Sequence, residues 1–200
     1  MKLLEIYPDL AYDERTPAGI DMEDYFLSTP LLEASREYAV HGDYRHFVIV
    51  KILLDNHANV SATNEQGLNP LGWAVIANNS EFVRFLVEEG GADVDQWILV
   101  DWTPLQWAGQ YGHIEILEYL IEKGGRLDAQ DKDGNTALHH AAAWGKTEAV
   151  KVLKEAGADT SVRNWEGKTA LDTPFDLWKG DGGYVEKIDD PVWGVNLIGM

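Results

Sequence analysis

The chain has 200 residues and 45% hydrophobic content, which fits one folded domain and excludes a collagen-like or wholly disordered chain. It carries 34 acidic against 16 basic residues, a formal net charge of -18, and such a charge repels phosphate backbones and anionic lipid. We therefore expect neither nucleic acid nor a membrane as a partner. Cysteine is absent, which excludes disulfides, thiolate metal sites and cysteine nucleophiles.

Residues 1–28 open the chain with two basic and seven acidic residues among scattered apolar side chains. The first ten residues are too short and too charged for a secretory signal peptide, and no run of 18 apolar residues occurs in the sequence. We therefore expect a cytoplasmic protein whose acidic N-terminal segment, 1–28, caps the domain that follows. The apolar residues available for this packing are Leu3, Leu4, Ile6, Tyr7, Tyr25 and Phe26.

From residue 29 onward a short motif recurs at regular intervals. The motif begins at Thr29, Asn69, Thr103, Thr136 and Thr169, with separations of 40, 34, 33 and 33 residues. A second marker, which contains Gly91, Gly124 and Gly157 in successive copies, keeps the same rhythm. Two markers in phase establish an internal repeat.

Each repeat contains two helical patterns. In the copy that begins at Thr136, the pattern predicts helices over residues 136–144 and 147–155, joined by a turn at Gly145. Thr103 and Thr136 stand where an N-cap is needed, and Pro104 occupies the first helical position, where its missing N–H costs nothing. The apolar residues predicted to pack between units include Leu138, Ala141, Val150 and Leu153.

These repeats resemble the ankyrin-repeat family, whose unit is a β-turn and two helices of about 33 residues with the signature Thr-Pro-Leu-His-x-Ala. The best match runs over residues 131–142, and the next begins at Thr103, where Gln106 stands in place of the usual His. The resemblance implies that His139, the signature His of its unit, orders a loop by hydrogen bonding. The first unit carries extra residues over 38–47, and Pro174 ends the last one.

We therefore expect an all-α ankyrin-repeat solenoid with four units, a partial fifth and irregular caps. The domain boundaries that follow are an acidic N-terminal cap segment over 1–28, an ankyrin-repeat domain over 29–178 and a C-terminal capping tail over 179–200. Departures from the repeat pattern at both ends are typical of capping repeats.

Aromatic residues recur at positions that a helical wheel turns away from the core, namely two, five and six residues after the core Leu of each first helix. The resemblance implies that this face lines a concave groove, and the loop tips beside it are unusually apolar. The residues predicted to bind a partner are Trp73, Ile76, Trp97, Leu99, Trp102, Trp107, Gln110, Tyr111, His140, Trp144 and Trp165. Clustered exposed aromatics mark interaction surfaces. The alternative is that several of these Trp side chains fill gaps between helices or lie under the tails.

The sequence gives no sign of catalysis, so we expect no enzyme, no catalytic residue, no cofactor and no metal. The two close His pairs, His41 with His46 and His139 with His140, lack the spacing that places two ligands on one helix face. The Gly-rich stretch 180–183 follows no strand, so it is no phosphate-binding loop. Picking an acid and base from 34 carboxylates would be arbitrary.

The expected function is non-catalytic protein binding. Acidic residues outnumber basic ones by six to one over 64–97 and by five to two over 98–130, which favours a basic partner gripped by an acidic, Trp-lined groove. The resemblance extends to small inhibitor proteins, including immunity proteins that neutralise a toxin or effector enzyme. The alternative function is an adaptor or scaffold that bridges two proteins, and an enzyme is the third possibility. The competing interpretation of the acidic charge is a plain solvated surface without a partner.

Overall fold

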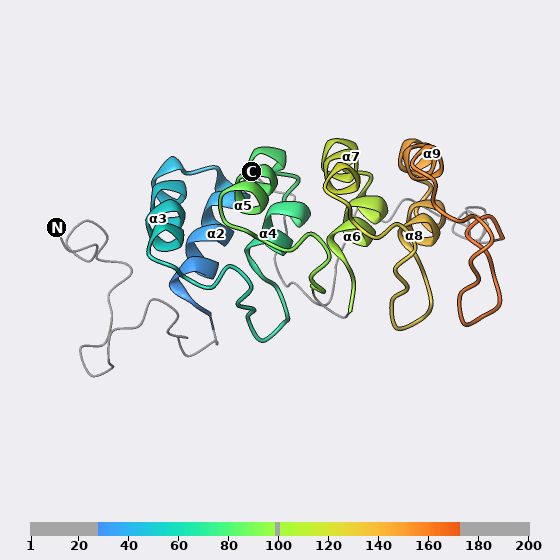
Figure 1. Ribbon diagram of the computed structural model, residues 1–200, viewed down its shortest axis with the longest axis horizontal. Coiled ribbons are helices and arrows are strands. Elements are labelled where there is room, and N and C mark those ends of the chain that lie inside the picture. Colours follow the sequence, from blue (N-terminus) through green and yellow to red (C-terminus); the bar gives the residue numbers. More distant parts are fainter. Residues whose placement is uncertain (1–27, 99–100, 173–200) are drawn as a thin grey trace, which may run out of the picture.

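The protein is described here by a computed structural model that covers residues 28–98 and 101–172. These residues form four helical hairpins stacked in a row, with long loops that all project to one side (Figure 1). The helices are α2 (Pro30–His41), α3 (Tyr44–Asp55), α4 (Pro70–Ile76), α5 (Ser80–Glu88), α6 (Pro104–Tyr111), α7 (Ile114–Glu122), α8 (Ala137–Ala143) and α9 (Thr147–Glu155). The predicted ankyrin-type, all-α solenoid is confirmed.

The stack has an inner and an outer row of helices. The inner helices α2, α4, α6 and α8 lie nearer the projecting loops and contact one another in sequence, while α7 contacts both α5 and α9 in the outer row (Figure 1). We call the projecting loops finger 2 (57–69), finger 3 (91–103), finger 4 (124–136) and finger 5 (157–169). Each of the first three fingers leads into an inner helix.

Every inner helix begins at a side-chain N-cap. The amide of the third helical residue donates to the cap side chain, at 2.7 Å for Asn69 and 3.3–3.4 Å for the three threonines, Thr29, Thr103 and Thr136. The predicted N-caps at Thr103 and Thr136 are therefore confirmed, as is Pro104 at the first helical position. The predicted helices of that last hairpin are also present, at Ala137–Ala143 and Thr147–Glu155.

The core is a continuous layer between successive hairpins. The central Leu of each inner helix after the first, Leu71, Leu105 and Leu138, is fully buried. Of the residues predicted to pack between units, Ala141 and Leu153 are buried and Val150 is half-buried. Because the main contacts of each described hairpin are with adjacent hairpins, stability in this part of the chain is approximately a sum of local terms.

The extra residues of the first unit lengthen its helices. α2 has 12 residues where α4 has 7, and only Gly42 and Asp43 separate it from α3. The proposed N-terminal cap over 1–28, apart from Ser28, and the tail over 179–200 lie outside the described residues, as does Pro174. None of the described helices is long and apolar enough to cross a membrane.

Candidate functional site

Three of the fingers share one hydrogen-bonding device. An Asn or Asp side chain just past the middle of the finger accepts two backbone amides, from the residues two and four positions later, at 2.8–3.1 Å. A glycine with positive φ stands three residues after it, with φ between 77° and 82°. The acceptors are Asn64, Asp131 and Asn164, and the glycines are Gly67, Gly134 and Gly167. Such caps and glycines are what a tight turn of this shape requires.

Finger 3 lacks both parts of the device. Ile98 stands at the position of the Asn or Asp, and Asp101 stands at the position of the glycine with φ 62°. The backbone instead closes through two hydrogen bonds between Ile98 and Trp102, of 2.7 and 3.3 Å. A non-glycine residue in the left-handed region costs roughly 1 kcal/mol, and such outliers cluster at functional sites. His57 at the start of finger 2 has a comparable φ of 66°, so two of the four fingers contain a non-glycine residue in the left-handed region.

Packing replaces hydrogen bonding where finger 3 meets the preceding unit. Ile98 is fully buried, and a Cβ added to Gly72 would lie 3.3 Å from Ile98 Cδ1 and 2.8 Å from Leu68 Cδ2. Gly72 occupies the third position of its helix, where the two following inner helices carry Gln106 and His139. The absence of a side chain at Gly72 thus gives Ile98 room to pack.

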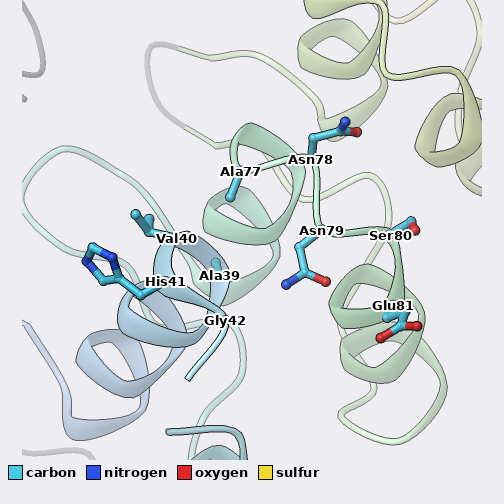
Figure 2. Close-up of a pocket in the computed structure, with 9 residues that line it drawn as sticks. All are labelled: Ala39, Val40, His41, Gly42, Ala77, Asn78, Asn79, Ser80 and Glu81. Carbon is cyan, nitrogen blue, oxygen red and sulfur yellow. The ribbon is translucent and has the colours of Figure 1, made fainter. Parts of the chain in front are cut away.

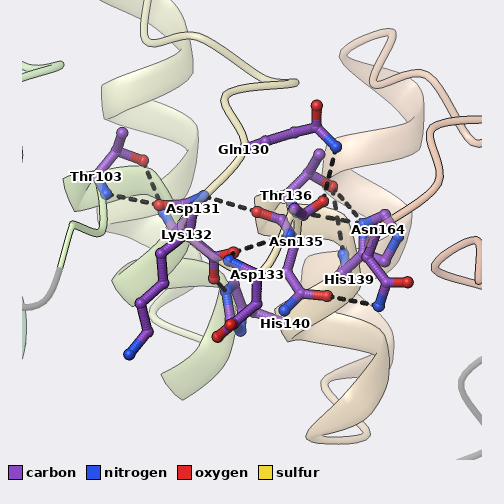
Figure 3. Close-up of polar contacts among 12 residues, drawn as sticks. Thr103, Gln130, Asp131, Lys132, Asp133, Asn135, Thr136, His139, His140 and Asn164 are labelled. Atoms are coloured by element: carbon purple, nitrogen blue, oxygen red, sulfur yellow. Dashed lines mark hydrogen bonds and ion pairs between the residues drawn. The ribbon is translucent and has the colours of Figure 1, made fainter. Parts of the chain in front are cut away.

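Gln106 and His139 make equivalent contacts in successive units, each with the N-cap amide of its own helix and with a carbonyl of the next finger. The Gln106 side chain accepts the Thr103 amide at 2.7 Å and donates to the carbonyls of Ala129 and Asn135 at 3.0 Å. The His139 ring accepts the Thr136 amide through Nδ1, at 3.2 Å, and its Nε2 lies 3.1 Å from the Lys168 carbonyl. Figure 3 labels Thr103, Asn135, Thr136 and His139 of this network. The structural role expected of His139 is confirmed.

A second polar pair is buried beside this network. His140 Nε2 lies 2.8 Å from Asp131 Oδ2, and the carboxylate side chain is fully buried (Figure 3). Burial by itself would raise the pKa of Asp131, but hydrogen bonds from His140 and from the amides of Asn135 and Asp133 outweigh it and lower the pKa. Asp131 therefore stays ionised, and its contact with His140 joins finger 4 to α8.

An aromatic row crosses from finger 3 along α6. The ring centroids of Trp102 and Trp107 lie 4.8 Å apart, and those of Trp107 and Tyr111 lie 5.7 Å apart in a stacked arrangement. The Trp102 ring also lies 3.8 Å from the ring of His140 in the next unit. We call Trp102, Trp107, Tyr111 and His140 the aromatic row. It couples finger 3 to two successive inner helices.

The wheel-based prediction of exposure is wrong for three residues. Trp107, Gln110 and His140 are buried, with exposed fractions of 6%, 9% and 7%. The wheel treats a helix as if it packed on one side, whereas an inner helix has neighbours in both adjoining units. These three residues therefore lie behind the surface.

The other residues predicted to bind a partner reach the surface to different degrees. Trp73, Ile76, Trp102 and Tyr111 are half-buried, Trp97, Trp144 and Trp165 are exposed by 38%, 47% and 68%, and Leu99 lies outside the described residues. Trp165 is exposed but docked, because its indole N–H donates to the Lys132 carbonyl at 3.0 Å and a Cβ at Gly134 would lie 2.8 Å from its ring. Trp165 thus ties finger 5 to finger 4.

The charge around finger 3 is one-sided. Residues 85–122 contain no Lys or Arg and eight acidic residues. Three of the eight meet cations of flanking segments: Glu88 pairs with Lys123, Asp95 with Arg126 and Glu115 with Arg84. Within the described part of the chain, Asp93 and Asp101 are exposed and form no ion pair. Finger 3 therefore carries two exposed carboxylates as well as the exposed Trp97.

An open hollow of about 490 Å³ lies at the opposite end of the hairpins, between the end of α2 and the turn from α4 to α5. Figure 2 shows the Asn79 side chain between these two elements, with Ser80 and Glu81 at the start of α5. The Asn79 side chain accepts the amide of Phe82 and so serves as the N-cap of α5. Over residues 28–98 and 101–172, no group of three His, Asp or Glu could hold a metal ion.

Comparison with known proteins agrees with this architecture. A model of the family "ankyrin repeats (3 copies)" matches residues 18–97, 37–131 and 96–164. The chain therefore belongs to the ankyrin-repeat family. These repeats are non-catalytic modules that mediate protein–protein interaction, so the repeat domain is a protein-binding module.

Several curated proteins contain a similar stretch. Neurogenic locus notch homolog protein 1 of Xenopus tropicalis is 29% identical over 137 residues, 68% of this chain and 5% of that protein. B-cell lymphoma 3 protein of Homo sapiens is 35% identical over 134 residues, 64% of this chain and 29% of that protein. Protein phosphatase 1 regulatory subunit 12A of Mus musculus is 50% identical over 40 residues, 20% of this chain and 4% of that protein. The chain spans less than a third of each.

Proposed function

We propose that this protein is a stoichiometric inhibitor of the immunity type, which captures a basic partner protein, such as a toxin or effector enzyme, in the cytoplasm. The observation that carries the proposal is finger 3, which has an exposed Trp97 and, in a stretch without Lys or Arg, two exposed carboxylates, Asp93 and Asp101, that form no ion pair with the described residues. The mouse relative is by its printed name a regulatory subunit of a phosphatase.

In this proposal, the acidic charge affects the association rate and the aromatic surface affects the dissociation rate. The acidic stretch would speed the encounter with a basic protein, since complementary charge raises association rates. Trp97, half-buried Trp102 and Trp144 would slow release, because large aromatics dominate interface energetics. Buried Trp107, Gln110 and His140 would act behind this surface by holding the rings in place.

Capture from a lysate of the source cell, followed by reconstitution with the purified partner, tests the proposal. We expect one basic protein in a 1:1 complex, loss of that partner's activity on binding, and association that slows as salt rises. Retained partner activity, together with simultaneous binding of a second protein, would establish the adaptor role instead. An acidic or neutral partner, or salt-independent association, contradicts the electrostatic part.

A further inference from the structure

The aromatic row contains a buried hydrogen-bond donor without an acceptor. Trp107 is 6% exposed, and its indole Nε1 has no hydrogen-bond partner among the described residues. One repeat later, His140 stands at the position of Trp107, and its Nε2 lies 2.8 Å from Asp131 Oδ2. At the position of Asp131, finger 3 has Ile98, whose side chain offers no acceptor. An unpaired buried donor destabilises the free protein, which indicates that another molecule supplies the acceptor.

Two half-buried rings flank this donor. The ring centroid of Trp107 lies 4.8 Å from that of Trp102 and 5.7 Å from that of Tyr111, which stacks on it. These distances keep the three rings within a span comparable to one turn of a polyproline II helix, about 9 Å. Residues 85–122, which include all three rings, carry eight acidic residues and no Lys or Arg. A carboxylate would be repelled here, so the missing acceptor is a neutral carbonyl.

We propose that the aromatic row binds a proline-rich segment of the partner protein, flanked by basic residues, with the Trp107 N–H donating to one of its main-chain carbonyls. This inference rests on the proposed capture of a basic protein and names the segment that is recognised. A polyproline II helix makes no internal hydrogen bonds, so its carbonyls are free to accept. Proline has no N–H, so the segment needs no acceptor from the row, and its rings pack on aromatic side chains.

Binding includes a movement of one ring, because Trp107 lies behind the surface in the free protein. The half-buried Trp102 ring turns aside to admit the carbonyl, a side-chain change of the kind that is common at interfaces. The Trp102 ring also lies 3.8 Å from the ring of His140, so its rotation breaks that contact. The ring resonances of His140 therefore report the movement.

The first test uses the full chain and three synthetic peptides, measured by calorimetry at fixed salt. One peptide has ten prolines with two arginines at each end, the second replaces the prolines by alternating Gly and Ser, and the third replaces the arginines by glutamates. We expect the first to bind about five-fold or more tightly than either of the others. Equal affinity for the first two overturns the inference and leaves the proposed capture of a basic protein intact. Equal affinity for the first and third overturns the basic flanks and the electrostatic part of the proposed function, but supports the proline site.

Three variants locate the contact. Trp107→Phe keeps a ring but removes the N–H, and Tyr111→Leu removes a flanking ring, so each should weaken binding of the arginine-flanked proline peptide about five-fold or more. Trp165→Phe, on finger 5, should leave the affinity within two-fold of the wild type. Circular dichroism establishes that each variant is folded. Unchanged affinity in Trp107→Phe overturns the assigned donor, and an equal loss in Trp165→Phe overturns the location.

The indole N–H resonance of Trp107 provides a readout that a purely structural role would not move. In protein labelled with nitrogen-15, it is the indole signal that disappears in Trp107→Phe. We expect this signal to shift downfield when the arginine-flanked proline peptide binds, because a hydrogen bond to a carbonyl deshields the proton. We expect the His140 ring signals to shift at the same time. A Trp107 signal that stays in place while the peptide binds contradicts the proposed contact.

Discussion

Ile98 packs into the space that Gly72 leaves open in the preceding hairpin, within 3.3 Å of the point where a Cβ would stand. This contact secures finger 3 where the later fingers use hydrogen bonds from Gln106 and His139. We expect Ile98→Ala to lower the free energy of unfolding by about 2–4 kcal/mol, because it opens a cavity at a fully buried position. Urea denaturation followed by circular dichroism measures this loss, and an unchanged midpoint would refute the packing role.

Gln106 is predicted to be interchangeable with His. Gln106→Ala removes a capping-box contact and two hydrogen bonds to finger 4, so it should destabilise the protein by about 1–3 kcal/mol. Gln106→His, which installs the side chain that His139 already uses, should recover at least half of that loss. Denaturant midpoints of both variants decide the matter. Equal destabilisation by Ala and His would show that His cannot make these contacts here.

Stability should decline at mildly acidic pH because of His139. Burial lowers the pKa of His139 below its ordinary value of 6.5. The unfolded chain therefore takes up this proton at a higher pH than the folded chain does. His139 destabilises the fold progressively as pH falls from 6.5 towards the lower folded pKa, and its contribution is flat above 6.5.

His139→Gln isolates that contribution. Gln106 shows that the amide makes equivalent contacts, and Gln does not titrate. We expect the variant to lose less stability than the wild type between pH 6.5 and pH 5, as measured by denaturation at a series of pH values. Parallel pH profiles for the two proteins would count against the assignment to His139.

The buried pair of Asp131 and His140 should be among the most sensitive positions. Removing one partner leaves the other buried without compensation, so Asp131→Ala should cost about 3–5 kcal/mol. Because the pKa of Asp131 is held below its ordinary 3.8, its contribution is complete above pH 3.8 and is lost as pH falls through the lower folded value. Acid unfolding curves of the wild type and variant should converge at low pH. A stable Asp131→Ala protein would show that the pair adds little.

Exposure alone does not identify a binding residue, and Trp165 illustrates this. Its ring is 68% exposed yet covers Gly134 and donates to Lys132, so Trp165→Ala should lower stability by roughly 1–2 kcal/mol. The calorimetric unfolding temperature measures the effect. Trp97→Ala, which removes the exposed Trp of finger 3, should lower the unfolding temperature much less. A larger loss for Trp97→Ala than for Trp165→Ala would show that Trp97, and not Trp165, is the structural residue.

The sequence predicts the repeat, the helices and their N-caps because each depends on short-range patterns. The role of His139 follows from its place in the signature. The burial of Trp107, Gln110 and His140 was not predicted, since it depends on how neighbouring hairpins close over an inner helix. The periodicity of one helix does not report how the neighbouring hairpins pack on it.

The finger device was missed although its signal is present in the sequence. Asn64, Asp131 and Asn164 recur with the repeat, and superposing the finger positions would have shown Ile98 as the exception. Asp101 would have emerged in the same way, at a position that is glycine in the other three fingers. The Gly72 and Ile98 contact requires three-dimensional proximity, and no local pattern reports it.

The chain of finger-to-finger hydrogen bonds has a mechanical consequence. Gln106 and His139 join fingers 3, 4 and 5 by hydrogen bonds, whereas the junction between fingers 2 and 3 has the apolar packing of Ile98 and, within the described ranges, a hydrogen bond from Gln96 to the Ser61 carbonyl. Apolar contacts slide at little cost, while directional bonds resist shear. Under tension along the stack, we expect the described hairpins after finger 3 to move as one stiff block, and we expect the described solenoid to stretch first at the junction between fingers 2 and 3.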